Sequence, residues 1–574
     1  MQIGIAGSGP AAESVRAALD DVDATATAAS PDGLGSYPVG VVIAPAGAPA
    51  FEAADAAARR WLAVEIGGLG GVAIPDLDAA VTVFADGVGY HDLTARVAAA
   101  DVEGDGDPSG SRSAVRLAGA VAGNRLVSLL SGADLAGTVV EVPGGERRVF
   151  AVPDAGNRDR TLRRTHRDAS LDDALDRAER AVDDRVGLLT RVGERESFPA
   201  PYYLASTSDT SVFSDVRAAA LTAGVDDDWD RAFMKALGEG LERYCAGVYR
   251  HEEFTTASPS AEAVEGRRAV PPTAFVGPDD RGGVAADESI PWVPGADLST
   301  GDDVGLPAEF VHYPAPEERF RPPITTGLGL GNSGVEALCS GLYEVIERDA
   351  TMLAWYSTYE PLGLSVDDEG FSALVDRARA VNLRVTPLLV TADVDVPVVA
   401  VAVHREGEWP RFAVGSGANL DAAAAARSAL AEALQNWMEL RAMGPKQAKA
   451  EEGAIGHYAD FPAEARAFVA DEASAAPRTG GGVPAASVGP DPVPTGAAEL
   501  DAVVDRATDA GLDAYAARLT TPDVAELGFE AVRVLVPTAQ PLFVDEPFFG
   551  ERAEAVPPEL GYESRLGRAF HPYP

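Results

Sequence analysis

Two copies of a Glu-x-x-Glu-Arg signature constrain this chain more than any other feature of its sequence. The first is Glu239-Gly-Leu-Glu242-Arg243, and the second is Glu344-Val-Ile-Glu347-Arg348. Each lies in a stretch whose apolar residues recur at helical spacing, so we expect both signatures to lie on helices.

The second signature extends backward to Glu336. On a helix each residue turns the side-chain direction by about 100°. Relative to Glu336, Glu344 then falls at about 80° and Glu347 at about 20°, so the three carboxylates share one face. Leu338 and Val345 fall at about 200° and 180°, which predicts an apolar stripe on the opposite face.

If the two carboxylate faces meet, they form a cluster of oxygen ligands suited to Mg²⁺ and a polyphosphate. ATP is itself anionic, so such a pocket also needs balancing arginines, which each signature supplies. The alternative is a solvated helix face beside arginine, the commoner meaning of acidic residues at this spacing. Lys235, one turn before Glu239, either neutralises a phosphate oxygen or forms an ion pair with Glu239.

From about Val192 onward the chain resembles the YcaO family, whose ATP site is built from Glu-x-x-Glu-Arg helices and a third segment bearing glutamine and arginine. The most specific match begins at Thr325-Thr-Gly-Leu-Gly-Leu-Gly-Asn332 and runs to Ala350. The third segment, from Ala429 to Arg441, matches more loosely, because Trp437 stands where the family has an arginine. The resemblance implies ATP and Mg²⁺ as cofactors. It assigns the nucleotide site to Lys235, Glu239, Glu242, Arg243, Asn332, Glu336, Glu344, Glu347, Arg348, Glu432 and Gln435. The implied metal ligands are Glu239, Glu242, Glu344 and Glu347.

The same resemblance implies phosphoryl transfer to a peptide amide oxygen. A Cys, Ser or Thr side chain as nucleophile gives an azoline heterocycle, whereas external sulfide gives a thioamide. The C-terminal part is similar to the azoline-forming cyclodehydratase branch, whose members act in peptide modification (RiPP biosynthesis) and end in alternating prolines. Here Pro572 and Pro574 remain, and we assign catalytic roles to them and to His571, the latter as a proton shuttle. Because chain ends normally fray, we expect this tail to contribute little to stability.

Two other functions stay open. One is thioamidation or another sulfur insertion, into peptide or RNA, with a partner protein. The other is an ATP-binding adaptor without chemistry of its own. We expect a peptide or protein substrate, and a sulfur-delivery or dehydrogenase partner is compatible with the sequence, as is a homodimer.

The first hundred residues alternate strand and helix patterns, which predicts βαβ units. Gly7-Ser-Gly9-Pro-Ala-Ala12 fits a dinucleotide fingerprint, but no acidic ribose partner follows, which favours a scaffold turn. The stretch from Val64 to Asp78 is similar to the ThiF-like partner domain of cyclodehydratases, although the cysteines expected near His91 are absent. We therefore predict an α/β N-terminal domain (Rossmann/ThiF-like, residues 1–185) followed by a larger α+β YcaO-type domain (residues 190–574). Between them we expect a helix over Leu171–Leu189, and a strand at Phe310–Tyr313.

Composition adds limits. The formal net charge is −42, and the chain has few lysines, which is typical of adaptation to high salt and argues against a nucleic-acid partner. No long apolar run predicts a membrane span, and no signal peptide precedes the first strand, so we expect a cytoplasmic protein. The two cysteines, Cys245 and Cys339, are expected to be small buried residues, and the histidines share no metal-ligand spacing.

Overall fold

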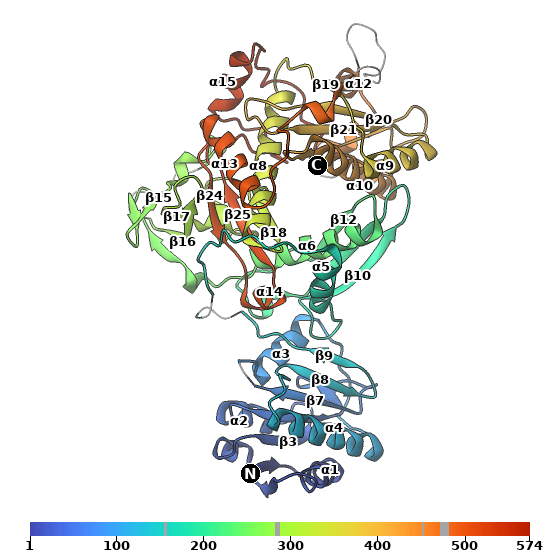
Figure 1. The fold of residues 1–574 in the computed structure, drawn as a ribbon, viewed down its shortest axis with the longest axis vertical. Helices are drawn as coiled ribbons and strands as arrows, with labels where there is room; N and C mark the ends of the chain where they lie inside the picture. Colours follow the sequence, from blue (N-terminus) through green and yellow to red (C-terminus); the bar gives the residue numbers. More distant parts are fainter. Residues whose placement is uncertain (86, 154–155, 157, 282–287, 451–452, 471–481) are drawn as a thin grey trace. The chain divides into compact units, whose positions relative to one another are not determined.

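The computed structural model describes residues 1–574 except 86, 154–155, 157, 282–287, 451–452 and 471–481. It is a mixed α/β structure with two compact units (Figure 1). Unit 1 comprises Met1–Asn157, Glu179–Arg191 and Ser206–Ala220, and unit 2 comprises Arg158–Ala178, Val192–Ala205 and Leu221–Pro574.

Unit 1 is built on a sheet that, in the described residues, has seven strands in the order β2-β1-β3-β4-β7-β8-β9. The first four are parallel, and β7, β8 and β9 are each antiparallel to the strand before them. The strands are β1 (Gln2–Ala6), β2 (Thr25–Ala28), β3 (Gly40–Pro45), β4 (Trp61–Ile66), β7 (Ala79–Phe84), β8 (Thr138–Val142) and β9 (Glu146–Arg148).

Helices cover both faces of this sheet. Helices α1 (Pro10–Leu19) and α4 (Arg112–Leu130) contribute to one buried apolar cluster, and α2 (Ala50–Ala57) and α3 (Tyr90–Ala99) contribute to the other. The alternation of strand and helix predicted for the first hundred residues is confirmed.

Unit 2 contains two larger sheets. One follows the path β14-β15-β17-β16-β24-β25-β18, with β13 (Thr255–Ala257) paired to β16, and the other runs β22-β21-β20-β19-β23. A small sheet has the order β10-β11-β12, and the division between the units falls within β10 and β11. The strands are β10 (Leu189–Glu196), β11 (Tyr202–Thr207), β12 (Leu221–Val225), β14 (Ala263–Val264), β15 (Arg267–Ala269), β16 (Ile290–Asp297), β17 (Asp303–Pro307), β18 (Leu328–Gly331), β19 (Leu362–Ser365), β20 (Arg384–Leu389), β21 (Val398–His404), β22 (Phe412–Ala418), β23 (Val483–Pro484), β24 (Tyr515–Arg518) and β25 (Glu530–Leu535).

Helix α8 (Gly334–Trp355) lies between the two larger sheets of unit 2, in contact with β18 and β25 on one side and with β21 and β22 on the other (Figure 1). Nearly all of its residues are buried, including the carboxylates of Glu347 and Asp349. The other helices of unit 2 are α5 (Leu171–Ala178), α6 (Trp229–Ala246), α7 (Ala308–Val311), α9 (Glu369–Ala380), α10 (Ala422–Ala448), α11 (Ile455–Tyr458), α12 (Ala463–Val469), α13 (Ala497–Asp509), α14 (Pro522–Leu527) and α15 (Glu551–Glu559).

Strand β22 is an edge strand whose two faces differ in side-chain size. Phe412 and Val414 pack in the cluster that contains α8, whereas Ala413 packs with α10. A Cβ on Gly415 would lie 2.5 Å from the carbonyl oxygen of Ala429 in α10. The absence of a side chain at Gly415 therefore lets α10 approach the edge strand, while α8 covers the opposite face.

One expected helix is shorter than predicted, and one expected strand is wrong. The helix that begins at Leu171 ends at Ala178, is followed by a 3₁₀ turn at Glu179–Ala181, and gives way to β10 at Leu189. The predicted strand at Phe310–Tyr313 is instead the short helix α7, which begins after Pro307. Phe310 stacks on Phe275 with ring centroids 4.2 Å apart, a contact between residues distant in sequence.

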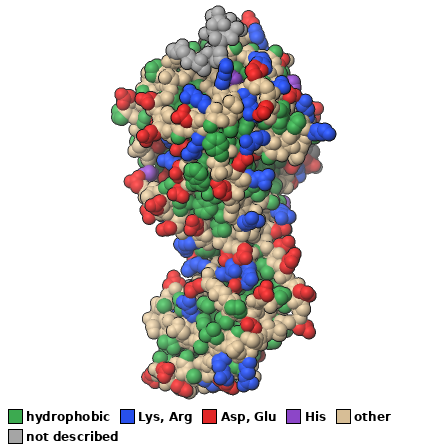
Figure 2. Space-filling model, turned by 90° about the vertical axis from the view of Figure 1, so that its right-hand side faces the viewer, with side chains coloured by type: hydrophobic (Ala, Val, Ile, Leu, Met, Phe, Trp, Pro, Cys, Tyr) green, Lys and Arg blue, Asp and Glu red, His purple; other side chains and the backbone are tan. Residues whose placement is uncertain are grey.

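The surface carries interspersed acidic and basic side chains on the face drawn in Figure 2, and its basic side chains are not gathered into one patch. No helix among the described residues is both long and apolar enough to cross a bilayer.

We predict that Gly415→Ala destabilises the protein by about 1–3 kcal/mol, because the new methyl group forces α10 away from β22. Thermal or denaturant unfolding measures this change. The matched control is Gly238→Ala in α6, where an added Cβ would lie 3.8 Å from the nearest heavy atom, a side-chain carbon of Leu330. That change should be neutral or stabilising by up to about 1 kcal/mol, as expected for glycine in a helix. Equal stability of the Gly415→Ala variant and the wild type would contradict the packing argument.

Candidate nucleotide and magnesium site

The first signature lies on α6, with its charges held together by one arginine. Arg243 forms ion pairs with Glu242 and, at 3.2 Å, with Oε1 of Glu239. The other oxygen of Glu239 accepts a hydrogen bond from the backbone N–H of Ala223 at 2.9 Å. Burial raises the pKa of Glu242 to about 7, against the opposing effect of Arg243. The nearby charges of Glu344 and Glu239 also raise it, which brings the carboxylates of α6 and α8 into one electrostatic cluster.

Lys235 does not form the ion pair with Glu239 that was one of its two expected roles. Its Nζ lies 2.7 Å from Oδ2 of Asp226 and donates to the carbonyl oxygen of Val225 at 3.2 Å. Asp226 is buried directly after the strand that precedes α6, and the Lys235 ammonium compensates the charge of its carboxylate. Binding of a phosphate oxygen by Lys235 stays a prediction.

The N-terminal end of α8 holds two of the predicted residues in local contacts. Oε2 of Glu336 accepts from the backbone N–H of Asn332 at 2.6 Å. The side-chain oxygen of Asn332 accepts from Arg177, which belongs to the segment before β10. Glu344, two turns further along, accepts from the backbone N–H of Gly327 through Oε2 at 3.0 Å. In the described part of the chain its other oxygen has no hydrogen-bond partner, which leaves it available to a cation.

The second and third segments meet at Ser416 of the edge strand β22. The Ser416 hydroxyl donates to Oε1 of Glu347 at 2.6 Å, and its backbone N–H donates to Oε2 of Glu432 at 2.7 Å. Arg348 lies 3.7 Å from Glu347 and 3.6 Å from Glu432. Burial raises the pKa of Glu347 to about 7 and also raises the pKa of Glu432, because Arg348 offsets only part of the desolvation.

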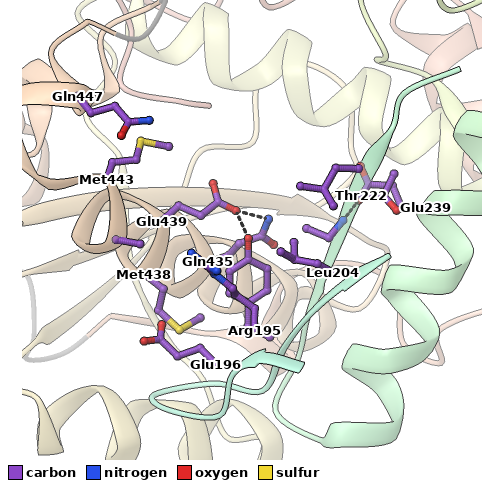
Figure 3. Close-up of a pocket in the computed structure, with 14 residues that line it drawn as sticks. Arg195, Glu196, Leu204, Thr222, Glu239, Gln435, Met438, Glu439, Met443 and Gln447 are labelled. Atoms are coloured by element: carbon purple, nitrogen blue, oxygen red, sulfur yellow. Dashed lines mark hydrogen bonds between the residues drawn. The ribbon is translucent and has the colours of Figure 1, made fainter. Parts of the chain in front are cut away.

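Gln435 lies on the same face of α10 as Glu432, and it lines a cavity of about 740 Å³ (Figure 3). Its amide nitrogen donates to Oε1 of Glu439 at 3.0 Å, and the hydroxyl of Tyr202 donates to the same oxygen at 2.8 Å. Glu239 of α6 also lines this cavity, and Met438 and Met443 supply apolar walls. Arg441 forms an ion pair with Glu196, which is itself one of the lining residues.

The C-terminal residues lie next to Arg348. Its Nη1 donates to the Pro574 carbonyl oxygen at 3.4 Å. His571 and Tyr573 are buried, with exposed fractions of 1% and 3%, and Nε2 of His571 lies 2.6 Å from the carbonyl oxygen of Phe543. Burial lowers the pKa of His571 to about 4, so the ring is neutral near pH 7 and donates to that carbonyl. The premise that this chain end is frayed is therefore wrong, whereas the catalytic roles of His571, Pro572 and Pro574 stay predictions.

Sequence reasoning missed Ser416, Tyr202 and Glu439. Ser416 carries a weak signal, because it stands between two glycines in an otherwise apolar strand. Tyr202 and Glu439 carry none, since their pairing joins residues far apart in the chain.

The donor set fits Mg²⁺, because it consists of carboxylate oxygens, the hard ligands that this ion prefers. Within the described ranges, however, no three acidic, histidine or cysteine side chains lie close enough to bind one ion together. Arg243 and Arg348 stand between the carboxylates, so a bound cation would have to exchange contacts with them. The four predicted metal ligands thus share one region, and their coordination stays a prediction.

A family model described as YcaO cyclodehydratase, ATP- and Mg²⁺-binding, matches residues 223–540, more than half of the chain. The chain belongs to the YcaO family. ATP and Mg²⁺ are accordingly the cofactors of this YcaO protein. Both cysteines of the YcaO region, Cys245 and Cys339, are free and buried, as expected.

Among curated relatives, an uncharacterized protein of Methanothermobacter thermautotrophicus is 30% identical over 247 residues, which cover 39% of this chain and 61% of that protein. The match thus spans less than two thirds of the relative's length. Two solved structures are similar to this YcaO protein over 98% of its length. A heterocyclase in complex with substrate and cofactor has a TM-score of 0.72 at 18% identity, with 83% of that chain covered. The heterocyclase TruD has a TM-score of 0.64 at 18% identity, with 81% covered. At this identity the likeness establishes the fold alone.

We predict that the stability of the nucleotide-free protein falls as pH rises from about 4.5 to about 7. Glu242 and Glu347 bind protons more tightly in the folded chain than in the unfolded chain, so the folded state is favoured below about 7 and this advantage is lost above it. Glu242→Gln should flatten the decline by on the order of 1–3 kcal/mol. Denaturant unfolding across this pH range, at constant salt and without Mg²⁺, measures the effect. The exposed Glu464→Gln is the control, and a slope that is identical in Glu242→Gln and wild type would refute the assignment.

We also predict that deletion of residues 571–574 lowers the melting temperature. Loss of two buried aromatic side chains should cost about 2–5 kcal/mol, as for large core truncations. Deletion of Pro574 alone is the control, because it removes the contact with Arg348 and keeps His571 and Tyr573. A melting temperature unchanged by the four-residue deletion would show that the tail is not packed in solution.

Proposed function

We propose that this protein is an ATP-dependent cyclodehydratase that phosphorylates a peptide backbone amide on oxygen and converts Cys, Ser or Thr residues to azolines. The observation that carries the proposal is that glutamates from α6, α8 and α10 converge around Arg243 and Arg348. They are Glu239, Glu242, Glu344, Glu347 and Glu432. Buried carboxylates are expensive unless they are paired or bind a metal. A site that gathers them from three helices is therefore suited to Mg²⁺ and a polyphosphate.

The proposed reaction has two stages. The side-chain nucleophile adds to the carbonyl carbon and loses its proton, and the resulting oxyanion forms a bond to the γ-phosphorus as the bond to the β-phosphate oxygen breaks. The C–O bond then breaks, phosphate leaves, and the C=N bond of the azoline forms with loss of the amide proton. Bound Mg²⁺ would neutralise charge on the phosphate oxygens, so catalysis would come chiefly from positioning and electrostatics.

The chain's own residues have distinct tasks in this proposal. Glu344, with one oxygen without a hydrogen bond in the described residues, is the readiest metal ligand, and Glu239, Glu242 and Glu347 complete the set by releasing their arginine contacts. Arg243 and Arg348 would turn toward phosphate oxygens as they release the carboxylates. Asn332 would need to leave Arg177 before its side-chain oxygen could contact the nucleotide.

The cavity of about 740 Å³ suits the adenosine part of ATP. Its size is within the range of small-molecule pockets, and it combines apolar walls with a few convergent polar groups. Glu239 joins it to the carboxylate cluster, so a nucleotide bound there would carry its phosphates toward Glu344. The polar groups Gln435, Glu439 and Tyr202 are already linked by hydrogen bonds, and they would contact ribose or base.

For the N-terminal domain, residues 1–185, we propose binding of the peptide substrate, on the strength of the resemblance to ThiF-like partner domains. Its parallel strands and flanking helices are compatible with that fold type. A dehydrogenase partner is compatible with this proposal, whereas a sulfur-delivery partner belongs to the competing thioamidation.

Thioamidation and a non-catalytic adaptor are the competing functions. Both are compatible with an ATP site, but they differ in products. An azoline is lighter than its precursor by one water, a thioamide gains sulfur in place of oxygen, and an adaptor leaves the peptide unchanged.

The test is peptide-dependent phosphate release by the purified protein with Mg·ATP and a Cys-containing peptide, in high salt, with mass analysis of the peptide. We expect release together with loss of water. Glu344→Gln and Glu347→Gln should each lower turnover at least tenfold, equivalent to about 1.4 kcal/mol of barrier, because each removes a ligand from the charge cluster.

The matched control is Asp505→Asn, an exposed carboxylate on α13. It should leave turnover unchanged. Phosphate release with an unmodified peptide would contradict the cyclodehydratase proposal, and sulfide-dependent gain of mass would favour thioamidation. Full activity in both glutamate variants would contradict the assignment of Glu344 and Glu347 to the nucleotide and magnesium site.

A further inference from the structure

The carboxylate of Glu439 is held in the cavity of about 740 Å³ in a way that leaves one of its oxygens open (Figure 3). Its Oε1 accepts two hydrogen bonds, from the hydroxyl of Tyr202 at 2.8 Å and from the amide nitrogen of Gln435 at 3.0 Å. In the part of the chain that the structure describes, Oε2 has neither a hydrogen bond nor an ion pair. The two donors therefore fix the carboxylate and leave Oε2 as an acceptor for a ligand.

The two donors belong to different elements of the fold. Tyr202 lies on β11, and Gln435 lies on α10 one turn before Glu439. Tyr202 is buried, and burial raises the pKa of its hydroxyl, as does the charge of Glu439, so the hydroxyl stays protonated and donates. A carboxylate fixed in this way loses little further freedom when a ligand binds to Oε2.

Glu439 also differs from the other carboxylates that line this cavity. Glu196 forms an ion pair with Arg441, and Glu239 forms one with Arg243. Among the described residues, no arginine or lysine forms an ion pair with Glu439. Its free oxygen is therefore available to a hydrogen-bond donor of the ligand.

The position of Glu439 along α10 indicates which part of a nucleotide it would meet. Glu432, Gln435 and Glu439 are three and four residues apart, so they lie one turn after another on one face. Glu432 lies in the carboxylate cluster beside Arg348. Glu439 lies about 10 Å further along the helix axis, at a rise of about 1.5 Å per residue. A nucleotide with its phosphates at the cluster would then bring its ribose to Gln435 and its base to Glu439.

The surroundings of Glu439 suit the faces of a base. Met438 and Met443 of α10 and Leu204 of β11 line the same cavity and supply apolar contacts. Adenine carries an amino group, a donor, at the position where guanine carries a carbonyl oxygen, an acceptor. A carboxylate oxygen accepts from the amino group and repels the carbonyl oxygen, so Oε2 of Glu439 would distinguish the two bases.

We propose that Glu439 selects adenine over guanine, by accepting a hydrogen bond from the amino group of the base through Oε2. Tyr202 and Gln435 are positioning residues, because they act on the base only by fixing Glu439. The inference rests on the assignment of this cavity to the adenosine part of ATP, made under the proposed function. It does not depend on whether the product is an azoline or a thioamide.

The test measures the preference of each protein for adenine over guanine. Wild type, Glu439→Gln and Tyr202→Phe are titrated with Mg·AMPPCP and with its guanine counterpart, Mg·GMPPCP, by calorimetry at constant salt and without peptide. We expect the wild type to bind Mg·AMPPCP at least about tenfold more tightly, since a site built around an acceptor rejects a ligand that lacks the donor. In Glu439→Gln the preference should fall to about twofold or less, because an amide also donates to a carbonyl oxygen.

Two further variants make the comparison specific. Tyr202→Phe keeps the ring and removes one donor to Oε1, so its preference should lie between those of the wild type and Glu439→Gln. Glu369→Gln is the matched control, because it makes the same change at an exposed carboxylate on α9, outside the cavity, and should keep the wild-type preference. The preference is a ratio within one protein, so a smaller folded fraction leaves it unchanged.

A 2′-deoxy analogue of AMPPCP separates the base from the ribose, whose hydroxyls are also donors. If Glu439 contacts the base, loss of the 2′-hydroxyl weakens binding equally in the wild type and in Glu439→Gln. A penalty that disappears in Glu439→Gln, with the adenine preference retained, would assign Glu439 to the ribose and overturn the proposal. So would a wild type that binds both bases equally.

The inference and the proposed function fail separately. An adenine preference that depends on Glu439, without any peptide-dependent phosphate release, would keep the role of Glu439 and reject the cyclodehydratase. Peptide-dependent release with loss of water, together with a preference that Glu439→Gln leaves unchanged, would do the reverse.

Discussion

The burial of α8 between two sheets is the constraint on which the site depends. A helix covered on nearly every side leaves little of its carboxylates to water. Glu347 is buried and Glu344 is half-buried, and both have partners within the protein. Gly327, Ser416 and Arg348 supply them. The site is thus a consequence of packing: the same contacts that make the helix stable bring charged groups from α6 and α10 to it.

The edge strands explain how three helices reach one another. In β22 the backbone N–H of Ser416 donates to Glu432 of α10, and its hydroxyl donates to Glu347 of α8. A single residue thus joins carboxylates from opposite faces of a sheet. Because β22 is an edge strand, its outer backbone N–H groups are not used by a neighbouring strand and can make such a contact. Gly415 permits the close approach of α10.

Structure that depends on the local spacing of residues can be predicted from the sequence, whereas structure that depends on tertiary contacts cannot. The helical spacing of Glu336, Glu344 and Glu347 predicts a helix with a carboxylate face, and α8 confirms the helix. It also suggests an apolar stripe on one side, whereas the helix is buried almost all round, because its neighbours come from β18, β21, β22 and β25. The ion pair of Lys235 with Asp226 and the helix at Phe310 depend likewise on tertiary contacts that no spacing rule contains. The expectation of a frayed tail fails for the same reason, since a hydrophobic cluster around Phe543 encloses His571.

Carboxylates and arginines divide the electrostatic work of the proposed site. Burial raises the pKa of Glu242 and of Glu347 to about 7, so both carboxylates hold protons near neutrality. A divalent cation bound there, as proposed, would compete with protons for the same oxygens. Binding of Mg²⁺ would release those protons, and it would also free Arg243 and Arg348 from their carboxylate partners. Arginines freed in this way would be available to the phosphates of the nucleotide. In the proposed site, binding of the metal would thus be coupled to the release of anion-binding groups, and neither charge would be buried without a partner.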